Sequence, residues 1–440
     1  MSSTETTILL RPRPYELCSG TLLLLPLLPK PKPIIPLPFD IWTEVLTFAF
    51  SEPTAHKRVG TRAWAWSLLT ISKAFSASIS SFEIALPLLY ASIRISKIGK
   101  LEAFYERLHV ADQKWDSIRR IPYSSPGRWV QALDVRDLAF EGQAQALLLD
   151  SLLTQIFPLV PFLSSLSVNP SFVLSRRVLS ALSQREGSVN LRSLTGLSYV
   201  PPPSMLPDED PFVNLLRCCP NLEVLGIIDQ GLDPTELQLD AADVELPSLA
   251  TFRPLSLPNL RILSLLSMHS SPLMLALLRS PLPGITKLTV TPYNDIPYPA
   301  SLVSELIATH GPALSSLMLL TLKSWPTRLR PSPPGLLDLA PHLNHLSLES
   351  PLPSLSLNQK HGLKILSIPR PTPNFWMTLE RLLPLLPDLT FIRARDVHWL
   401  KKGISSVAQE AGIQGEMRLW KRRLERRGIR LLDANWHEHE

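Results

Sequence analysis

The sequence predicts an α/β protein, with a small helical domain near the N-terminus followed by an irregular leucine-rich-repeat solenoid with parallel strands. Three observations support this prediction. About one residue in five is leucine. Leucine-like residues recur at the spacing L-x-x-L-x-L from Tyr90 onward, which is typical of solenoid repeats. Helical stretches separate most of the copies, so parallel strands would line one face and helices the other.

The N-terminal region divides into two parts. Residues 1–36 carry many prolines and no amphipathic period, which predicts a flexible leader. From Leu37 the sequence LPFDIWTEVLTFAF places apolar residues on one helical stripe, with Pro38 at a position that a first helical turn tolerates. Spacings of four, three and four residues from Trp64 to Phe75 predict a second helix. We therefore expect a helical domain over 37–92.

The repeats begin at Tyr90 and continue to the C-terminal region, so we expect the solenoid and its cap to occupy 93–440. Successive copies start 20 to 38 residues apart, and the copy at Leu191 fits imperfectly. The residues at the two inner leucine positions are Ile93 and Ile95, Leu133 and Val135, Leu166 and Val168, Leu194 and Leu197, Leu225 and Ile227, Leu263 and Leu265, Leu288 and Val290, Leu317 and Leu319, Leu346 and Leu348, Leu366 and Ile368, and Ile392 alone.

Helices are predicted between these strands at 146–157, 212–219, 272–279, 301–310 and 375–386. Asn169 suits the turn after its strand. Two stretches, 230–257 and 323–335, do not fit the alternation and are predicted to be loops.

Composition excludes several classes of protein. Three cysteines cannot build a disulfide framework, and the leucine run at 22–25 is far too short to span a membrane. No cleavage site follows that run, which argues against secretion. A formal charge of +6 over 440 residues is mild, so nucleic-acid binding is not expected from charge alone. We expect a protein of the cytoplasm, the nucleus or both.

The stretch LPFDIWTEVL, followed by LLTISKAF and LPLLYASIRI, resembles an F-box domain of the kind common in fungal proteins. Asp40, Phe75 and the inserted residues 51–65 depart from the usual pattern. The element CCPNLEVLGI at 218–227 is similar to leucine-rich repeats found behind F-boxes.

This combination implies the substrate-recognition subunit of a cullin-RING (SCF-type) ubiquitin ligase. The F-box would bind a Skp-family adaptor, and through it the cullin complex, while the solenoid would bind an unknown target protein. The expected adaptor-binding residues share the apolar stripe: Leu37, Pro38, Ile41, Trp42, Val45 and Leu46. The alternatives are that this stripe packs internally, and that the chain is an interaction scaffold without ligase engagement.

No motif for phosphate binding, dinucleotide binding, serine hydrolysis or zinc proteolysis is present, so we expect no enzymatic activity, cofactor or metal. Cys218 and Cys219 could be reactive or bind metal, but their leucine-rich surroundings favour packing. His437 and His439 alternate with glutamates and could bind a metal, although a frayed polar tail is the preferred interpretation.

The arginine-rich segment 418–430 has two interpretations. It could be a nuclear-import or nucleic-acid patch. We favour a helix that closes the solenoid, in which Trp420, Leu424 and Ile429 pack inward while the arginines reach solvent. This helix should extend from about 404 to 427, end at Gly428, and be followed by a strand that pairs with the edge at Leu389 and Ile392.

Overall fold

A computed structural model describes the regions over which the repeats were predicted. The described residues are residue 44 and residues 87–113, 126–201, 206–229, 252–268, 270–293, 301–321, 332–400 and 412–438. The predicted leader, almost all of the F-box-like segment, residues 230–251 and residues 323–331 lie outside this part of the chain.

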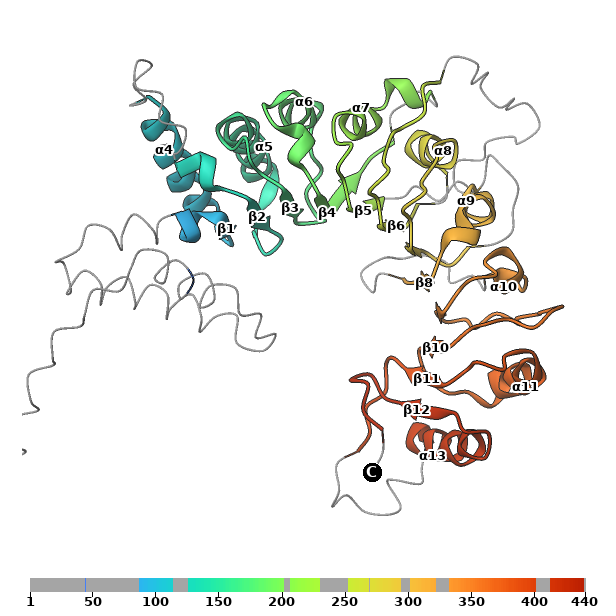
Figure 1. Cartoon of the computed structure of the whole chain (residues 1–440). Helices are drawn as coiled ribbons and strands as arrows, with labels where there is room; N and C mark the ends of the chain where they lie inside the picture. The colour runs from blue at the N-terminus through green and yellow to red at the C-terminus, as the bar shows by residue number, and fades with distance from the viewer. Residues whose placement is uncertain are drawn as a thin grey trace, which may run out of the picture.

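Within the described residues, twelve parallel strands form one sheet in sequence order. The strands are β1 (Ser92–Arg94), β2 (Ala132–Val135), β3 (Ser165–Val168), β4 (Ser193–Tyr199), β5 (Val224–Asp229), β6 (Ile262–Leu266), β7 (Lys287–Val290), β8 (Ser316–Leu319), β9 (His345–Ser347), β10 (Ile365–Ile368), β11 (Phe391–Ala394) and β12 (Arg430–Leu432). The sheet curves into an arc with the strands on its inner side (Figure 1). The predicted fold class is confirmed: the chain is an α/β solenoid.

The helices lie on the outer side of the arc (Figure 1). They are α4 (Ile98–Gln113), α5 (Gly142–Leu159), α6 (Arg176–Gln184), α7 (Pro211–Arg217), α8 (Pro272–Leu278), α9 (Val303–His310), α10 (Leu336–Leu339), α11 (Pro373–Leu382) and α13 (Gly412–Glu425). All five helices predicted within the solenoid are present. Residues 98–113, 176–184 and 336–339 form helices that the sequence pattern did not single out.

Prolines begin several of these helices and explain part of the high proline content. Pro211, Pro272 and Pro373 each occupy the first turn of a helix, where no intrahelical partner is needed for a backbone N–H. The side chain just before each proline accepts a backbone N–H at the helix start, as Ser271 does from Met274. The strand-to-helix turns are therefore encoded locally.

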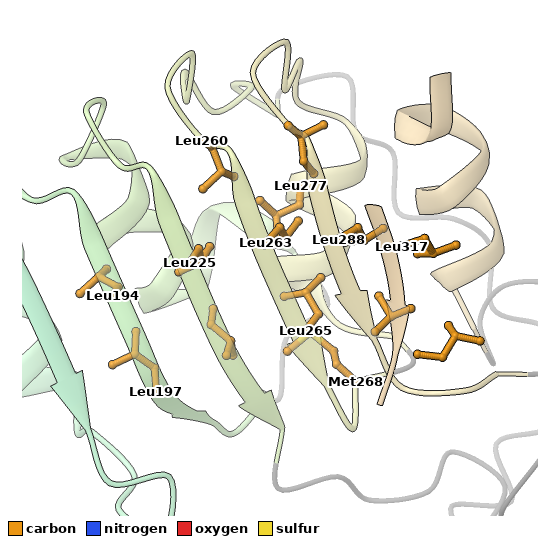
Figure 2. Close-up of a cluster of buried hydrophobic side chains, with 14 of the residues drawn as sticks. Leu194, Leu197, Leu225, Leu260, Leu263, Leu265, Met268, Leu277, Leu288 and Leu317 are labelled. Carbon is orange, nitrogen blue, oxygen red and sulfur yellow. The ribbon is translucent and has the colours of Figure 1, made fainter. Parts of the chain in front are cut away.

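One column of aliphatic residues, here called the buried column, runs across the strands and forms part of the core (Figure 2). Residues paired in register across the twelve strands are Ile93, Leu133, Leu166, Leu194, Leu225, Leu263, Leu288, Leu317, Leu346, Leu366, Ile392 and Leu431. From Leu133 onward each member is at most 1% exposed. No repeat could bury such a residue alone, so neighbouring repeats stabilise one another.

The copy at Leu191 fits the pattern imperfectly because β4 contains a bulge. Leu194 pairs with Leu225, but the next pair is Leu197 with Ile227, so β4 uses one extra residue. Gly196 lies in this bulge with a φ of 70°, and a Cβ there would lie 2.2 Å from the carbonyl oxygen of Val168. Glycine is therefore required at this position.

Beside this bulge, a buried tyrosine and aspartate join β4 to α7. The Tyr199 hydroxyl donates to Asp210 Oδ2 at 2.6 Å, and Asp210 Oδ1 accepts the backbone N–H of Phe212 at 2.7 Å. Burial raises the pKa of Asp210, while the hydrogen bonds from Tyr199 and Phe212 oppose that rise. The buried Asp210 carboxyl group is therefore stabilised by these two hydrogen-bond donors.

We expect Tyr199→Phe to lower the free energy of unfolding by about 1–3 kcal/mol, because it leaves a buried acceptor without its donor. Urea denaturation followed by circular dichroism measures this change. Tyr105→Phe on α4 is the control, since Tyr105 is only half-buried. Equal stability of the Tyr199→Phe variant and the unmodified chain would contradict a structural role for this hydrogen bond.

The C-terminal segment closes the last repeat, as the sequence indicated. Residues 412–425 of the predicted helix are described as α13, Gly428 has a φ of 72°, and β12 pairs with β11. Trp420 and Leu424 are fully buried, and Trp420 packs edge-on against Trp376 of α11 at 5.0 Å between ring centroids. The arginines at 422, 426 and 427 remain exposed. This region thus forms the cap of the sheet.

Candidate functional site

The concave face of the sheet lies on the side opposite the helices (Figure 1). Side chains alternate along each strand, so the neighbours of the buried column point away from the helices. One row of these residues, here called the outward column, immediately precedes the buried column. It comprises Ser92, Ala132, Ser165, Ser193, Val224, Ile262, Lys287, Ser316, His345, Ile365, Phe391 and Arg430.

The N-terminal part of the concave face carries mainly small polar side chains. The hydroxyls of Ser167 and Thr195 hydrogen-bond across β3 and β4 at 2.8 Å. At β2, Asp134 accepts from the guanidinium of Arg136 at 2.9 Å. Burial raises the pKa of Asp134, but hydrogen bonds and the charge of Arg136 outweigh burial and hold that pKa below its ordinary value. These polar groups are therefore largely satisfied within the chain.

The C-terminal part has a different chemistry, which centres on Trp436. The guanidinium carbon of Arg393 lies 4.4 Å from the Trp436 ring centroid, and the His345 ring lies edge-on at 6.5 Å. His345 Nε2 is 2.9 Å from the Ser367 hydroxyl. Lys287 stands in the same outward column as His345, two strands away. We call Lys287, His345, Arg393 and Trp436 the basic–aromatic patch.

Residues 433–438 fold back after β12 and bring Trp436 to this position. Asp433 Oδ1 accepts the backbone N–H groups of Asn435 and His437 at 2.8 and 2.9 Å, and a β-bridge joins Leu432 to Glu438. Arg393 Nη2 also donates to the Ala434 carbonyl at 2.6 Å. The expected frayed tail is thus wrong as far as Glu438, because the Asp433 carboxylate organises a tight turn.

Three cationic side chains act on His345 at the patch. Burial, together with the charges of Lys287, Arg393 and Arg395, lowers the pKa of His345 to about 4. Arg395 itself is paired with Glu349 at 2.9 Å and also donates to the Leu348 carbonyl at 2.8 Å. Both side chains of this ion pair are mostly buried, so Arg395 joins β9 to β11 rather than facing a ligand.

A cavity of about 280 Å³ lies elsewhere, between α6 and α7 near the end of β4. Its lining is mainly apolar. Arg176 and Asp210 also line it, and the Asp210 carboxyl group accepts a hydrogen bond from Tyr199. The geometry of this cavity is explained by packing of the two helices.

The structure describes some of the residues that the sequence predicted to be functional, and others lie outside the described part of the chain. Leu37, Pro38, Ile41, Trp42, Val45 and Leu46 lie outside the described residues, so their adaptor-binding role stays a prediction. Cys219 is fully buried, and burial raises the pKa of its thiol to about 12, which makes it unreactive. Cys218 is half-buried against the same core.

Two further observations concern metals and membranes. Within the described ranges, no group of three or more histidine, cysteine or acidic side chains is arranged to hold a metal ion. Among those same residues, no helix combines the length and the apolar character needed to cross a membrane.

The basic–aromatic patch was not predicted. Aligning the repeats would have shown Lys287, His345 and Arg430 at the same outward position, which is a recognisable signal. Nothing in the sequence indicates that Trp436 reaches His345, because that contact depends on the turn at Asp433.

Comparisons with known proteins show similarity to solved structures. No protein-family model matches the sequence, and no curated protein matches it. Among solved structures, the chain is similar to a chain in the crystal structure of the Rad7 and Elc1 complex in yeast, with a TM-score of 0.27 and 14% sequence identity. The alignment covers 78% of this chain and 95% of that chain.

Proposed function

We propose that this chain is the substrate-recognition subunit of an SCF-type cullin-RING ubiquitin ligase. In this proposal residues 37–92 bind a Skp-family adaptor and thereby join the cullin complex, and the solenoid binds the protein to be ubiquitylated. The proposal makes the chain a non-catalytic receptor of the cytoplasm or the nucleus.

The observation that carries the proposal is the continuous concave face of the solenoid. Twelve parallel strands present their outward side chains along one arc, while the buried column and the helices supply rigidity. A curved, rigid surface of this kind suits recognition of a protein, because many side chains can contact one partner at once. The resemblance of the segment beginning at Leu37 to an F-box adds the link to the ligase.

The size of the N-terminal segment supports a partner for it. About 50 residues bury too little apolar surface to be stable alone, so an amphipathic helix there gains stability from an adaptor groove. If the stripe packed internally instead, the chain would be a scaffold without ligase engagement. Adaptor binding separates these two functions.

We expect the double variant Leu37→Ala, Pro38→Ala to bind a purified Skp-family adaptor at least about tenfold more weakly, a loss of about 1.4 kcal/mol. The reason is the loss of apolar contact area at the predicted helix start. Biolayer interferometry with the immobilised adaptor measures the affinity, and circular dichroism checks that the solenoid is intact.

The matched control is Glu44→Ala, Thr47→Ala, because these residues lie off the apolar stripe of the same predicted helix. Its affinity should equal that of the unmodified chain. Unchanged binding of the Leu37→Ala, Pro38→Ala variant would remove those residues from the interface.

A further inference from the structure

We propose that the basic–aromatic patch, together with Arg430, binds an extended acidic segment of a partner protein. As a statement about the ubiquitylation target, this inference rests on the proposed function. Binding of the acidic segment itself does not require the ligase, so the two can be tested separately.

The first argument is the arrangement of charge along the outward column. Lys287 and Arg430 stand on β7 and β12, five strand spacings apart, which is roughly 24 Å along the sheet. Arg430 is exposed and its guanidinium carbon lies 4.7 Å from the Phe391 ring centroid. An extended peptide of about seven residues spans this distance at about 3.3 Å per residue. Carboxylates at its two ends would therefore meet both cations.

The second argument is that the patch carries more positive than negative charge within the described part of the chain, even with the Asp433 carboxylate near Arg393. Among the described residues, neither Lys287 nor Arg393 forms an ion pair with a carboxylate, whereas Arg395 pairs with Glu349. Burial is the main cause of the lowered pKa of His345, and the charges of Lys287, Arg393 and Arg395 lower it further. An acidic ligand would supply the missing counter-charge.

The third argument is that Trp436 is already positioned for a ligand. Its side chain is 45% exposed, while its backbone adopts a φ of 66°, which is unfavourable for a bulky residue. The Asp433 hydrogen bonds and the Arg393 guanidinium hold it in place. Exposed tryptophan and arginine held rigidly at the centre of a surface are typical of interface residues that contribute strongly to affinity.

The limited extent of the basic surface favours a peptide over a nucleic acid. Among the described residues of the concave face, the cations without an ion pair lie on β7–β12, whereas β1–β4 carry mainly small polar residues and the ion-paired Arg94 and Asp134. Glu349 and Asp433 also adjoin the patch. Strong nucleic-acid binding needs a longer series of phosphate contacts than this surface offers.

The test measures fluorescence anisotropy of a labelled oligoglutamate of about eight residues, long enough to span the column, with the full-length chain. Oligolysine of equal length and oligothymidylate are the comparison probes. We expect oligoglutamate to bind, binding to weaken with added salt, and the other probes to bind at least about tenfold more weakly. Preferential binding of oligothymidylate would overturn the proposal in favour of a nucleic-acid site.

The decisive variant is Lys287→Ala, Arg430→Ala, and its matched control is Arg422→Ala, Arg426→Ala, which changes exposed arginines on α13 and in the turn just after it. Both remove two positive charges, but only the first pair faces the concave surface. Affinity for oligoglutamate should fall about tenfold in the first and stay within about twofold in the control. An equal loss of affinity in the two double variants would show that oligoglutamate is attracted only by net charge, which would refute the proposal. Absence of oligoglutamate binding by the unmodified chain would refute it as well.

Trp436→Ala should weaken oligoglutamate binding, and Trp436→Phe should restore part of it, because phenylalanine keeps an aromatic face over Arg393. Adaptor affinity should be unchanged in all these variants. Peptide binding without adaptor binding would leave this inference standing and refute the ligase assignment, whereas the reverse result would refute this inference alone.

Discussion

Leu317→Ala and Leu346→Ala should each lower the free energy of unfolding by roughly 2–5 kcal/mol. Both leucines are fully buried and pair with each other across β8 and β9, so truncation leaves a cavity in the middle of the buried column. Because each repeat is stabilised by its neighbours, the loss of stability should extend to the repeats on both sides. Urea denaturation followed by circular dichroism measures the effect.

Met318→Ala is the matched control, since Met318 lies on β8 next to Leu317 but on the concave side and is only partly buried. It should destabilise the chain much less than Leu317→Ala. If both leucine variants unfolded at the same urea concentration as the unmodified chain, the continuous core described for this solenoid would be wrong.

Deletion of residues 404–440 should make the protein aggregate. The deletion removes β12 from the edge of β11 and uncovers Trp376, which packs against Trp420. It also removes the buried side chains of Met417, Leu424 and Leu431. An open strand edge beside exposed apolar surface favours association between chains. Size-exclusion chromatography with light scattering measures the oligomeric state.

The control for this deletion keeps the cap and reverses the charge of two of its exposed arginines. Arg422→Glu, Arg426→Glu alters only exposed side chains on α13 and in the turn after it, so the protein should stay soluble and monomeric. A soluble, monomeric deletion variant would contradict the capping role. It would favour the alternative interpretation of segment 418–430 as an import or nucleic-acid patch.

The strands could be predicted because the leucine spacing within each repeat fixes which residues of its strand are buried. Leu288, Leu317 and Leu346 all precede a second aliphatic residue by two positions, and a buried residue at that position must face the helices. Gly196 disturbs this spacing by one residue, which is why the copy at Leu191 fitted poorly. Local pattern therefore sufficed for the core.

Helices and the concave site were less predictable for physical reasons. The helix at 98–113 has only Leu101 and Leu108 fully buried, so its apolar period is weak. The patch joins His345 to Trp436 across residues far apart in sequence, and that proximity arises from the Asp433 turn. Repeat alignment alone would have placed Lys287 and Arg430 in one column, but not Trp436 beside them.

The most direct test of the ligase assignment is whether the unmodified full-length chain forms a stable complex with a purified Skp-family adaptor. The two proteins are mixed at micromolar concentrations and separated by size-exclusion chromatography with light scattering. The proposed function predicts one peak whose mass equals one copy of each protein. Two separate peaks at the masses of the free proteins would contradict it, and would leave the solenoid as an interaction scaffold outside the ligase.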